Sequence, residues 1–283
     1  MDSIFNSRTW QLAGGRSLEL GPRSVIMGIL NVTPDSFSDG GKFDTYEAAI
    51  SQTQKMAGEG ASIIDIGGES TRPGAEPLTA AEEQERVLPI IETLSKDTDL
   101  IISIDTFRAE TAELALKAGA HIINDVWGFQ KDPDIAHVAK KHGAGVCAMH
   151  TGRDRNRDSD VIVDQCNYLS VSLEVLKGAG VSDEAIVLDP GFGFAKDPHE
   201  NIQLLARFEE LHKFGYPLLS GTSRKRFIGH FTGRDADNRD IGTAATSVVA
   251  RMKGVAVFRV HDVASNADAL AIADAVISNG RVN

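Results

Sequence analysis

Short apolar runs alternate with longer amphipathic stretches along the whole chain. Each run is rich in Ile, Val and Leu and stops at a polar residue, which is typical of strands buried on both faces of a parallel sheet. The runs predict eight strands, at Val25–Leu30, Ser62–Ile66, Ile101–Asp105, His121–Asp125, Gly145–His150, Ala185–Asp189, Pro217–Ser220 and Val255–Val260.

The stretches between these runs have helical periodicity. In one of them apolar residues recur in steps of four and three along one face, at Ile162, Cys166, Leu169, Leu173 and Leu176. Another begins at Thr79, where Glu82 is placed to complete a capping box. The other helices are expected at Thr45–Ala57, Arg108–Ala118, Pro133–Lys141 and Asn201–Phe214, with two more after the seventh and eighth strands. A glycine precedes most strands, where a helix needs a left-handed closing residue.

This alternation favours an α/β fold of the (β/α)₈ barrel type. Eight strand–helix units follow one another, and no linker or shift in composition divides the 283 residues. We therefore expect a single barrel domain over residues 1–283. Ahead of the barrel, Arg8–Leu12 and Arg16–Leu20 flank a glycine turn, which predicts an N-terminal β-hairpin that acts as a lid or a plug.

Composition narrows the function classes. A net charge of −11 argues against nucleic acid or an anionic membrane surface as a partner, so local cations must hold any anionic substrate. Residues 1–11 lack the basic start and apolar middle of a signal peptide, and no apolar run is long enough to span a membrane. Cys147 and Cys166 are expected to be buried thiols in a reducing compartment. The expected location is the cytoplasm.

Barrel enzymes place their chemistry at the carboxyl ends of the strands. Those ends carry Asn31, Asp65, Asp105, Asn124, Asp125, His150, Asp189, Ser223–Lys225, Arg259 and His261. Asp and Asn also cap the helices that follow strands, but capping does not explain three cations beside a ring of carboxylates. The pattern suggests two roles: Asp105, Asn124 and Asp189 would bind the edge of a heterocycle. Arg259, His261 and a metal on Asn31 would hold a phosphate.

Two long motifs carry a family resemblance. Met27–Gly41 and Asp65–Gly74 resemble the two signatures of dihydropteroate synthase, a pterin-binding enzyme family. Further matches follow in family order at Ser103–Thr106, Ile123–Val126, Asp189–Phe194, Gly221–Lys225 and Arg259–Val263. The resemblance covers nearly the whole chain.

The resemblance implies a transferase of folate biosynthesis that moves an alkyl group other than methyl. It would condense 6-hydroxymethyl-7,8-dihydropterin pyrophosphate with 4-aminobenzoate, giving 7,8-dihydropteroate and pyrophosphate. The diphosphate would leave first and the amine would then attack. The resemblance also implies a homodimer and a sulfonamide target.

The family's functional residues map onto this chain. The pterin site would comprise Asp65, Asp105, Asn124, Met149, Asp189, Phe194, Lys225 and Arg259. The diphosphate would meet Asn31, Arg259, His261 and Mg²⁺, with Asn31 as the metal ligand. The 4-aminobenzoate site would comprise Phe37, Thr71, Arg72 and Pro73. The catalytic set would be Asp35, Lys225, Arg259 and His261, with Asp35 either steadying the cation or accepting the amine proton.

Two features depart from the family pattern. Arg226 stands where many members have a small hydroxyl residue, and residues 151–157 form a charged run that we interpret as a solvated loop.

The alternative functions are a pterin-dependent methyltransferase and an inert pterin-binding barrel. The first would not need the two signature loops, and no corrinoid-binding segment follows the barrel.

Overall fold

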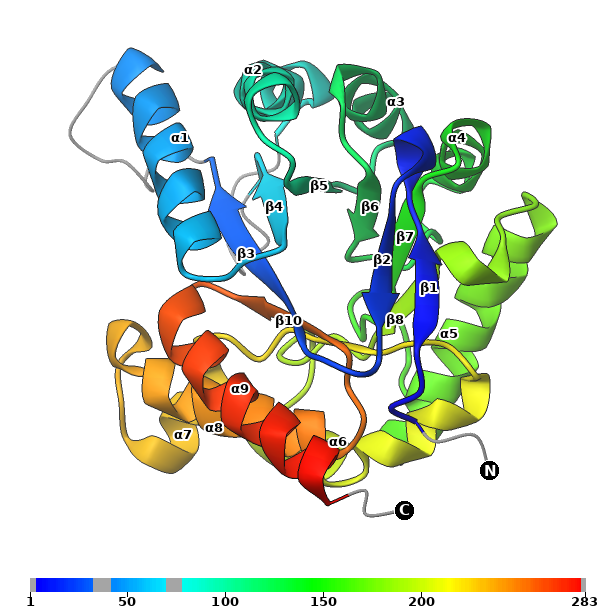
Figure 1. The fold of residues 1–283 in the computed structure, drawn as a ribbon. Coiled ribbons are helices and arrows are strands. Elements are labelled where there is room, and N and C mark those ends of the chain that lie inside the picture. Colours follow the sequence, from blue (N-terminus) through cyan, green and yellow to red (C-terminus); the bar gives the residue numbers. More distant parts are fainter. Residues whose placement is uncertain (1–3, 33–41, 70–77, 281–283) are drawn as a thin grey trace.

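Eight parallel strands form the centre of the molecule (Figure 1). The computed structural model describes residues 4–32, 42–69 and 78–280. The strands are β3 (Val25–Asn31), β4 (Ile63–Gly67), β5 (Ile101–Asp105), β6 (Ile122–Asp125), β7 (Gly145–Met149), β8 (Ile186–Asp189), β9 (Leu219–Ser220) and β10 (Val257–Val260). They pair in the order β8-β7-β6-β5-β4-β3-β10-β9, and a bridge between Leu188 and Leu218 joins the two ends. The predicted (β/α)₈ barrel is confirmed.

Helices surround the strands on the outside. They are α1 (Lys42–Gly58), α2 (Ala80–Asp97), α3 (Ala109–Ala118), α4 (Asp134–His142), α5 (Val161–Gly178), α6 (Pro198–Ala206), α7 (Arg226–Thr232), α8 (Asp240–Met252) and α9 (Val263–Asn279). The capping box at Thr79 and Glu82 starts α2 as predicted. The glycines expected to close helices all have positive φ, at Gly60, Gly119, Gly143, Gly180, Gly215 and Gly254.

Two details of the helix prediction are wrong. The helix expected over Asn201–Phe214 is two elements: α6 ends at Ala206, and a 3-10 helix covers Phe208–Phe214. The apolar spacing continues through this break, so periodicity alone does not reveal it. The seventh strand is followed by two helices, α7 and α8, because Gly233 in the left-handed region ends α7.

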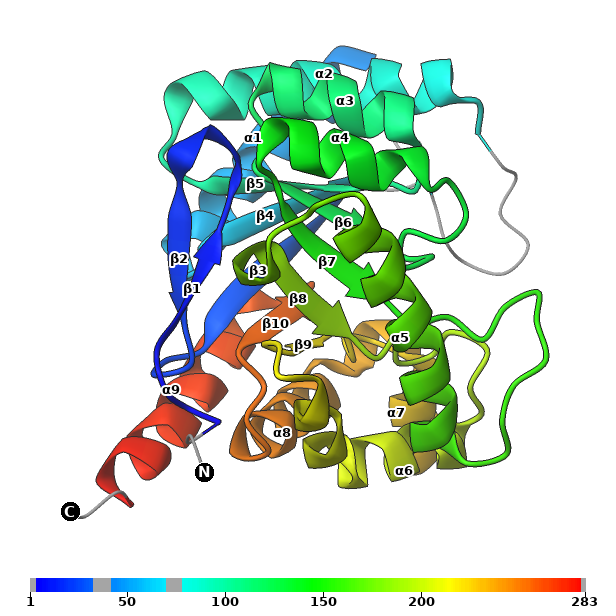
Figure 2. The same cartoon turned by 90° about the vertical axis from the view of Figure 1, so that its right-hand side faces the viewer.

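The N-terminal hairpin is a plug. Its strands, β1 (Arg8–Gln11) and β2 (Ser17–Leu20), pair antiparallel across the end of the barrel where the strands begin (Figure 2). Trp10 is 1% exposed and donates from Nε1 to the carbonyl of Ala185 at 2.8 Å. Leu12 packs so closely on Gly145 that a Cβ there would collide with it. The hairpin therefore closes the end of the barrel interior where the strands begin, which we call the lower end.

The core has two layers. An outer layer lies between strands and helices, where Ile64 and Ile102 share a cluster with Val87 and Leu169. The inner layer fills the lower barrel with residues of the hairpin and the strands: Trp10, Leu12, Leu20, Val25, Met27, Ile63, Ile101, Ile122, Cys147, Val187, Leu219, Ala256 and Val257. Cys147 is buried as expected, but Cys166 is only half-buried, and both are free thiols. Within the described residues, none of the helices is long and apolar enough to cross a membrane.

Candidate active site

The upper end of the barrel interior, where the strands finish, is polar. Side chains alternate along a strand, so Ile63 and Asp65 of β4 both point inward, one below the other. Asp65 lies in register with Ser103 of β5, and Asp105 with Asn124 of β6. The ends of neighbouring parallel strands thus bring the predicted polar residues to one face.

Arg259 of β10 connects two carboxylates across this face. Its Nε donates to Asp65 Oδ2 at 2.6 Å, and its Nη2 donates to Asp105 Oδ2 at 2.7 Å. Asn124 also donates to Asp65 Oδ2, at 3.0 Å. The other oxygen of Asp65, Oδ1, is buried and has no hydrogen-bond partner among the described residues. A buried acceptor of this kind is costly unless a donor reaches it, and a ligand can supply that donor.

A second group lies at the ends of β7 and β8. Asp189 accepts from the backbone N–H of Gly191 at 2.7 Å. The Lys225 ammonium lies 4.2 Å from the centroid of the Phe194 ring. Phe194, Met149 and Val126 form a small apolar cluster. This group combines a carboxylate, a cation and an apolar surface, as recognition of a flat, polar-edged heterocycle requires.

Burial shifts the ionisation of these groups. It raises the pKa of Asp189 to about 6, against the effect of the Gly191 N–H and of Lys225. It also raises the pKa of Asp105, although Arg259 opposes the shift. Burial, together with Arg259, lowers the pKa of Lys225 to about 8. Perturbed groups that gather at one end of a barrel point to a functional site.

The residues expected to hold a phosphate lie at the same rim. His261 Nδ1 lies 2.9 Å from Ser223 Oγ, which also accepts from the His261 backbone N–H at 3.1 Å. Burial lowers the pKa of His261 to about 3, so the ring is neutral at pH 7. The Ser223 hydroxyl can donate to Nδ1, which leaves the ring proton on Nε2 as a hydrogen-bond donor.

Asn31 ends β3 next to Gly67. A Cβ at Gly67 would lie 3.7 Å from Asp105 Oδ2 and 3.9 Å from Asn31 Oδ1, so both oxygens flank this glycine. The described residues contain no group of three or more His, Cys, Asp or Glu side chains that could hold a metal. The described residues alone would therefore leave a cation at Asn31 short of ligands, which oxygens of substrate and water can supply.

Several predicted residues lie outside the described part of the chain: Asp35, Phe37, Thr71, Arg72 and Pro73. The residues that flank positions 70–77 are both bound by Arg108, which sequence reasoning missed. Its Nη1 donates to Glu69 Oε2 at 2.6 Å, and its Nη2 donates to the carbonyl of Leu78 at 2.6 Å.

The charged run at 151–157 is not simply a solvated loop. Arg155 donates to both oxygens of the buried Asp164, at 2.8 and 2.7 Å. The Arg153 guanidinium lies 4.7 Å from the centroid of the Phe194 ring, and Arg157 pairs with Glu200. The interpretation holds for Asp154, Asn156 and Arg157, which are exposed. It is wrong for Arg155, because Asp164 on α5 is a buried partner that a charge pattern does not reveal. Arg226, the other departure, is exposed in the first turn of α7.

Comparison with known proteins agrees with this geometry. The family model described as "Pterin binding enzyme" matches residues 27–261. The chain is 46% identical to the dihydropteroate synthase of Clostridium beijerinckii, over 93% of this chain and 98% of the relative. It is 45% identical to that of Bacillus subtilis, over 92% and 91%.

Solved structures give the same result. The dihydropteroate synthase of Clostridium difficile, crystallised in the presence of pteroic acid, superposes with a TM-score of 0.89 at 47% identity, covering 92% of this chain and 98% of that one. That of Xanthomonas albilineans, with 4-aminobenzoic acid, gives 0.90 at 41% identity, covering 97% and 100%.

Proposed function

Because the chain belongs to the dihydropteroate synthase family of pterin-binding enzymes, we propose that the polar upper end of its barrel is the site of that family's reaction. The family is a transferase family of folate synthesis. It condenses 6-hydroxymethyl-7,8-dihydropterin pyrophosphate with 4-aminobenzoate, and the products are 7,8-dihydropteroate and pyrophosphate. The relatives named above give no support to the alternative of a methyltransferase.

The pterin ring binds between the two polar groups of the site. The Asp189 carboxylate accepts from adjacent N–H donors of the aminopyrimidinone edge, and Asn124 offers both a donor and an acceptor. Lys225 donates to ring acceptors, while Phe194 and Met149 pack on the ring. The observation that carries the proposal is the bridge from Arg259 to Asp65 and Asp105, which leaves Asp65 Oδ1 without a partner among the described residues.

The diphosphate binds at Asn31, Arg259 and His261. His261 is neutral and donates a hydrogen bond from Nε2, so the positive charge at the diphosphate comes from Arg259 and would be completed by a bound Mg²⁺ ion. The amide oxygen of Asn31 is a hard donor of the type that Mg²⁺ accepts, and this ion usually takes the rest of its ligands from substrate phosphates and water. The metal would stabilise the charge on the departing diphosphate.

The reaction proceeds by departure and then attack. The C–O bond breaks with its electrons on the diphosphate, and the pterin ring delocalises the positive charge left on the methylene. Arg259 stabilises the leaving anion while Asp105 and Asp189 lie near the cation. The aniline nitrogen then forms the C–N bond and loses a proton, for which Asp35 is the proposed acceptor. Cys147 forms no covalent intermediate, because burial raises its pKa well above the usual range.

The second substrate binds last. The 4-aminobenzoate site comprises Phe37, Thr71, Arg72 and Pro73, which lie outside the described residues and follow β3 and β4 in the sequence, whereas most of the pterin residues end the strands. We therefore expect 4-aminobenzoate to bind tightly only when pterin pyrophosphate, or pyrophosphate with Mg²⁺, is already present.

An assay of pyrophosphate release tests the function. With Mg²⁺ and the pterin substrate, sustained release should require 4-aminobenzoate and should match the dihydropteroate formed. An inert pterin-binding barrel would bind the pterin and release no pyrophosphate, and a methyltransferase would not use this substrate. Release that proceeds at the same rate without 4-aminobenzoate would contradict the proposal.

We also propose that the 283-residue barrel is one domain, acts in the cytoplasm and assembles as a homodimer. The two free cysteines support a reducing compartment. The support for assembly is that α8 and α9, which lie side by side (Figure 1), both carry exposed apolar residues. These residues are Ile241, Val249, Met252, Ile272 and Val276. Exposed large apolar side chains on neighbouring helices favour an interaction surface there. A single monomeric mass in sedimentation at micromolar concentration would rule the dimer out.

A further inference from the structure

The segment after β8 is held between two parts of the barrel rim. Gly191, Gly193 and Ala195 all have φ in the left-handed region, at 64°, 79° and 51°. A Cβ at Gly191 would collide with the carbonyl oxygen of His150, and one at Gly193 would lie 2.9 Å from Cδ of Lys225. The segment is therefore in contact with the end of β7 on one side and with Lys225 on the other.

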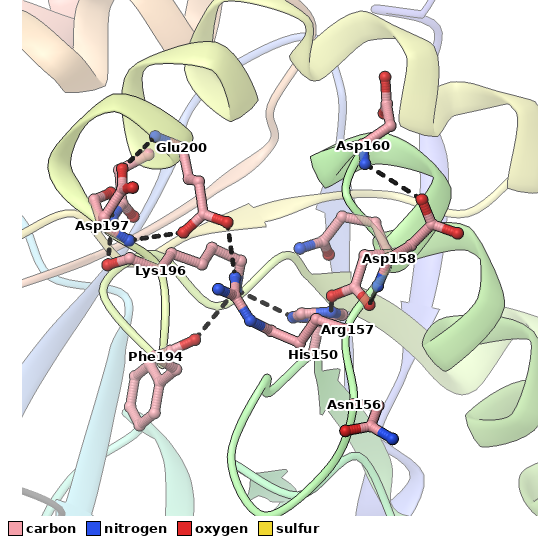
Figure 3. Close-up of polar contacts among 12 residues, drawn as sticks. His150, Asn156, Arg157, Asp158, Asp160, Phe194, Lys196, Asp197 and Glu200 are labelled. Carbon is pink, nitrogen blue, oxygen red and sulfur yellow. Dashed lines mark hydrogen bonds and ion pairs between the residues drawn. The ribbon is translucent and has the colours of Figure 1, made fainter.

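Lys196 binds this segment from within. Its side chain is buried, and its Nζ donates to the carbonyls of Gly191 at 2.9 Å and of Phe194 at 3.4 Å. The third contact is His150 Nδ1 at 2.9 Å. An ammonium group has three donors, and the three acceptors match that number. In Figure 3 the side chain extends from the segment towards His150 and the Phe194 carbonyl.

His150 is in turn fixed on its other side. Its Nε2 lies 2.9 Å from Asp164 Oδ2, a carboxylate that Arg155 also binds. The ring packs edge-on against Tyr168, with centroids 5.1 Å apart. Nε2 also lies 2.8 Å from Nη2 of Arg155. Because the Lys196 ammonium can only donate, Nδ1 of the neutral ring is its acceptor, and the ring proton lies on Nε2, which faces Asp164. The network thus connects the segment after β8 to β7 and α5.

Stability does not account for a lysine at this position. Among the described residues, the hydrogen-bond partners of its Nζ are two carbonyls and an imidazole, with no carboxylate. Burial lowers the pKa of Lys196 to about 7, with Asp189 and Asp164 opposing the shift. A buried cation without a directly bonded anion costs stability, so a role in shaping the site explains its presence better.

We infer that Lys196 is a positioning residue of the pterin pocket, acting through the segment it binds and through His150. Three pocket groups depend on that segment: Asp189 accepts from Gly191 N–H, Phe194 belongs to it, and Lys225 packs on Gly193. This inference rests on the proposed function, because it specifies how the same pocket is held ready for the pterin ring.

The test is calorimetric titration of 6-hydroxymethylpterin into the full-length Lys196→Met variant, which keeps the length of the stem and removes the donors. We expect the Kd to rise about ten-fold, because the pocket groups that depend on the segment are displaced. One ligand should still bind per folded chain. In steady-state assays the KM for pterin pyrophosphate should rise. The KM for 4-aminobenzoate at saturating pterin pyrophosphate should stay within about two-fold of the wild-type value.

A matched control is Arg157→Met. Arg157 is a neighbouring cation whose ion pair with Glu200 lies at the surface (Figure 3). The same replacement there should leave the pterin Kd unchanged. A purely structural role for Lys196 would lower the fraction of competent protein without changing the Kd of what remains, and an unchanged Kd would overturn the inference.

A second variant decides the matter if Lys196→Met does not fold. His150→Phe keeps an aromatic ring against Tyr168 and both Arg155–Asp164 hydrogen bonds, but it removes the acceptor for Lys196 and the contacts of Nε2 with Asp164 and Arg155. We expect its pterin Kd to rise about three-fold, because the link from Lys196 to α5 is lost. A wild-type Kd in this variant would also overturn the inference. Failure of the wild-type protein to bind the pterin would instead count against the proposed function.

Discussion

The two ends of the barrel interior are built from the same strands and differ in almost every property. At the lower end, Ile63 of β4 packs in the same inner apolar cluster as Trp10 of the hairpin, and both are essentially unexposed. Two residues further along β4, Asp65 has one oxygen bound by Arg259 and the other without a partner among the described residues. One strand thus contributes a stabilising apolar side chain at its lower end and a carboxylate with an unpaired oxygen at its upper end.

This difference between the two ends explains how the upper end can hold groups that lower the free energy of unfolding. The pKa of Asp189 is raised and that of Lys225 is lowered. Both shifts mean that hydrogen bonds and neighbouring charges do not fully offset the cost of burying a charged group. Such groups reduce the free energy of unfolding, and the apolar lower end and outer layer offset that cost. The account therefore predicts that mutations at the two ends have opposite signatures.

The largest effect is expected at the lower end. Trp10→Ala removes a fully buried indole and its hydrogen bond to Ala185, and should lower the free energy of unfolding by about 3–5 kcal/mol. The folded fraction should still bind pterin with the wild-type Kd. Denaturant unfolding followed by calorimetry checks both statements. A changed Kd in folded protein would show that the two ends are not independent.

The opposite signature is expected for Lys225→Met. Turnover, measured as pyrophosphate release, should fall by about 100-fold or more, because a donor to the ring and a charge near the reacting centre are lost. The free energy of unfolding should not fall, and should rise by about 1 kcal/mol, since a partly buried ammonium with a lowered pKa is removed. A variant that is both inactive and strongly destabilised would contradict this division.

The upper end should also respond to pH. Asp189 must be ionised to accept two N–H donors, and its pKa in the free enzyme is raised to about 6. Pterin affinity should therefore fall about ten-fold per unit as the pH drops well below 6. Titrations over this range check the slope, and Asp189→Asn should remove most of it while weakening binding throughout. A flat profile in the wild-type enzyme would exclude Asp189 as the acceptor.

The smallest effect is expected within one strand, β4, where a lower-end residue and an upper-end residue can be compared directly. Ile63→Val should cost about 1 kcal/mol of unfolding free energy and leave turnover unchanged. Asp65→Asn, two residues further along, should reduce turnover with little loss of stability. Paired measurements of turnover and urea unfolding on the two variants provide the check. If Ile63→Val reduced turnover as much as Asp65→Asn did, the lower end would share in the function.

Much of the barrel was predictable because its signals are local. An apolar run bounded by polar residues reports a buried strand, and the Thr79 capping box and the closing glycines report helix ends. The break after Ala206 was not predictable, because Phe208 and Leu211 continue the apolar spacing. The shortness of β9 depends on its neighbours, since only Leu219 and Ser220 pair with β10.

The site was predictable as a set of residues and less so as an arrangement. Strand ends and family motifs indicated Asp65, Asp105 and Arg259, but only the structure shows that Arg259 bridges the two carboxylates. Lys196 follows an ordinary loop in the sequence, and its partner His150 lies 46 residues earlier. Such contacts depend on how distant segments pack, which no local pattern encodes.

The most direct test of the account is whether the pterin pocket exists before any other component binds. The measurement is calorimetric titration of 6-hydroxymethylpterin into the free enzyme at neutral pH, without Mg²⁺ or 4-aminobenzoate and repeated with Asp105→Asn. The account predicts one site per chain, a Kd that 4-aminobenzoate leaves within about two-fold of its original value, and much weaker binding to the variant. Binding that appears only when Mg²⁺ or 4-aminobenzoate is added, or that the variant retains in full, would contradict it.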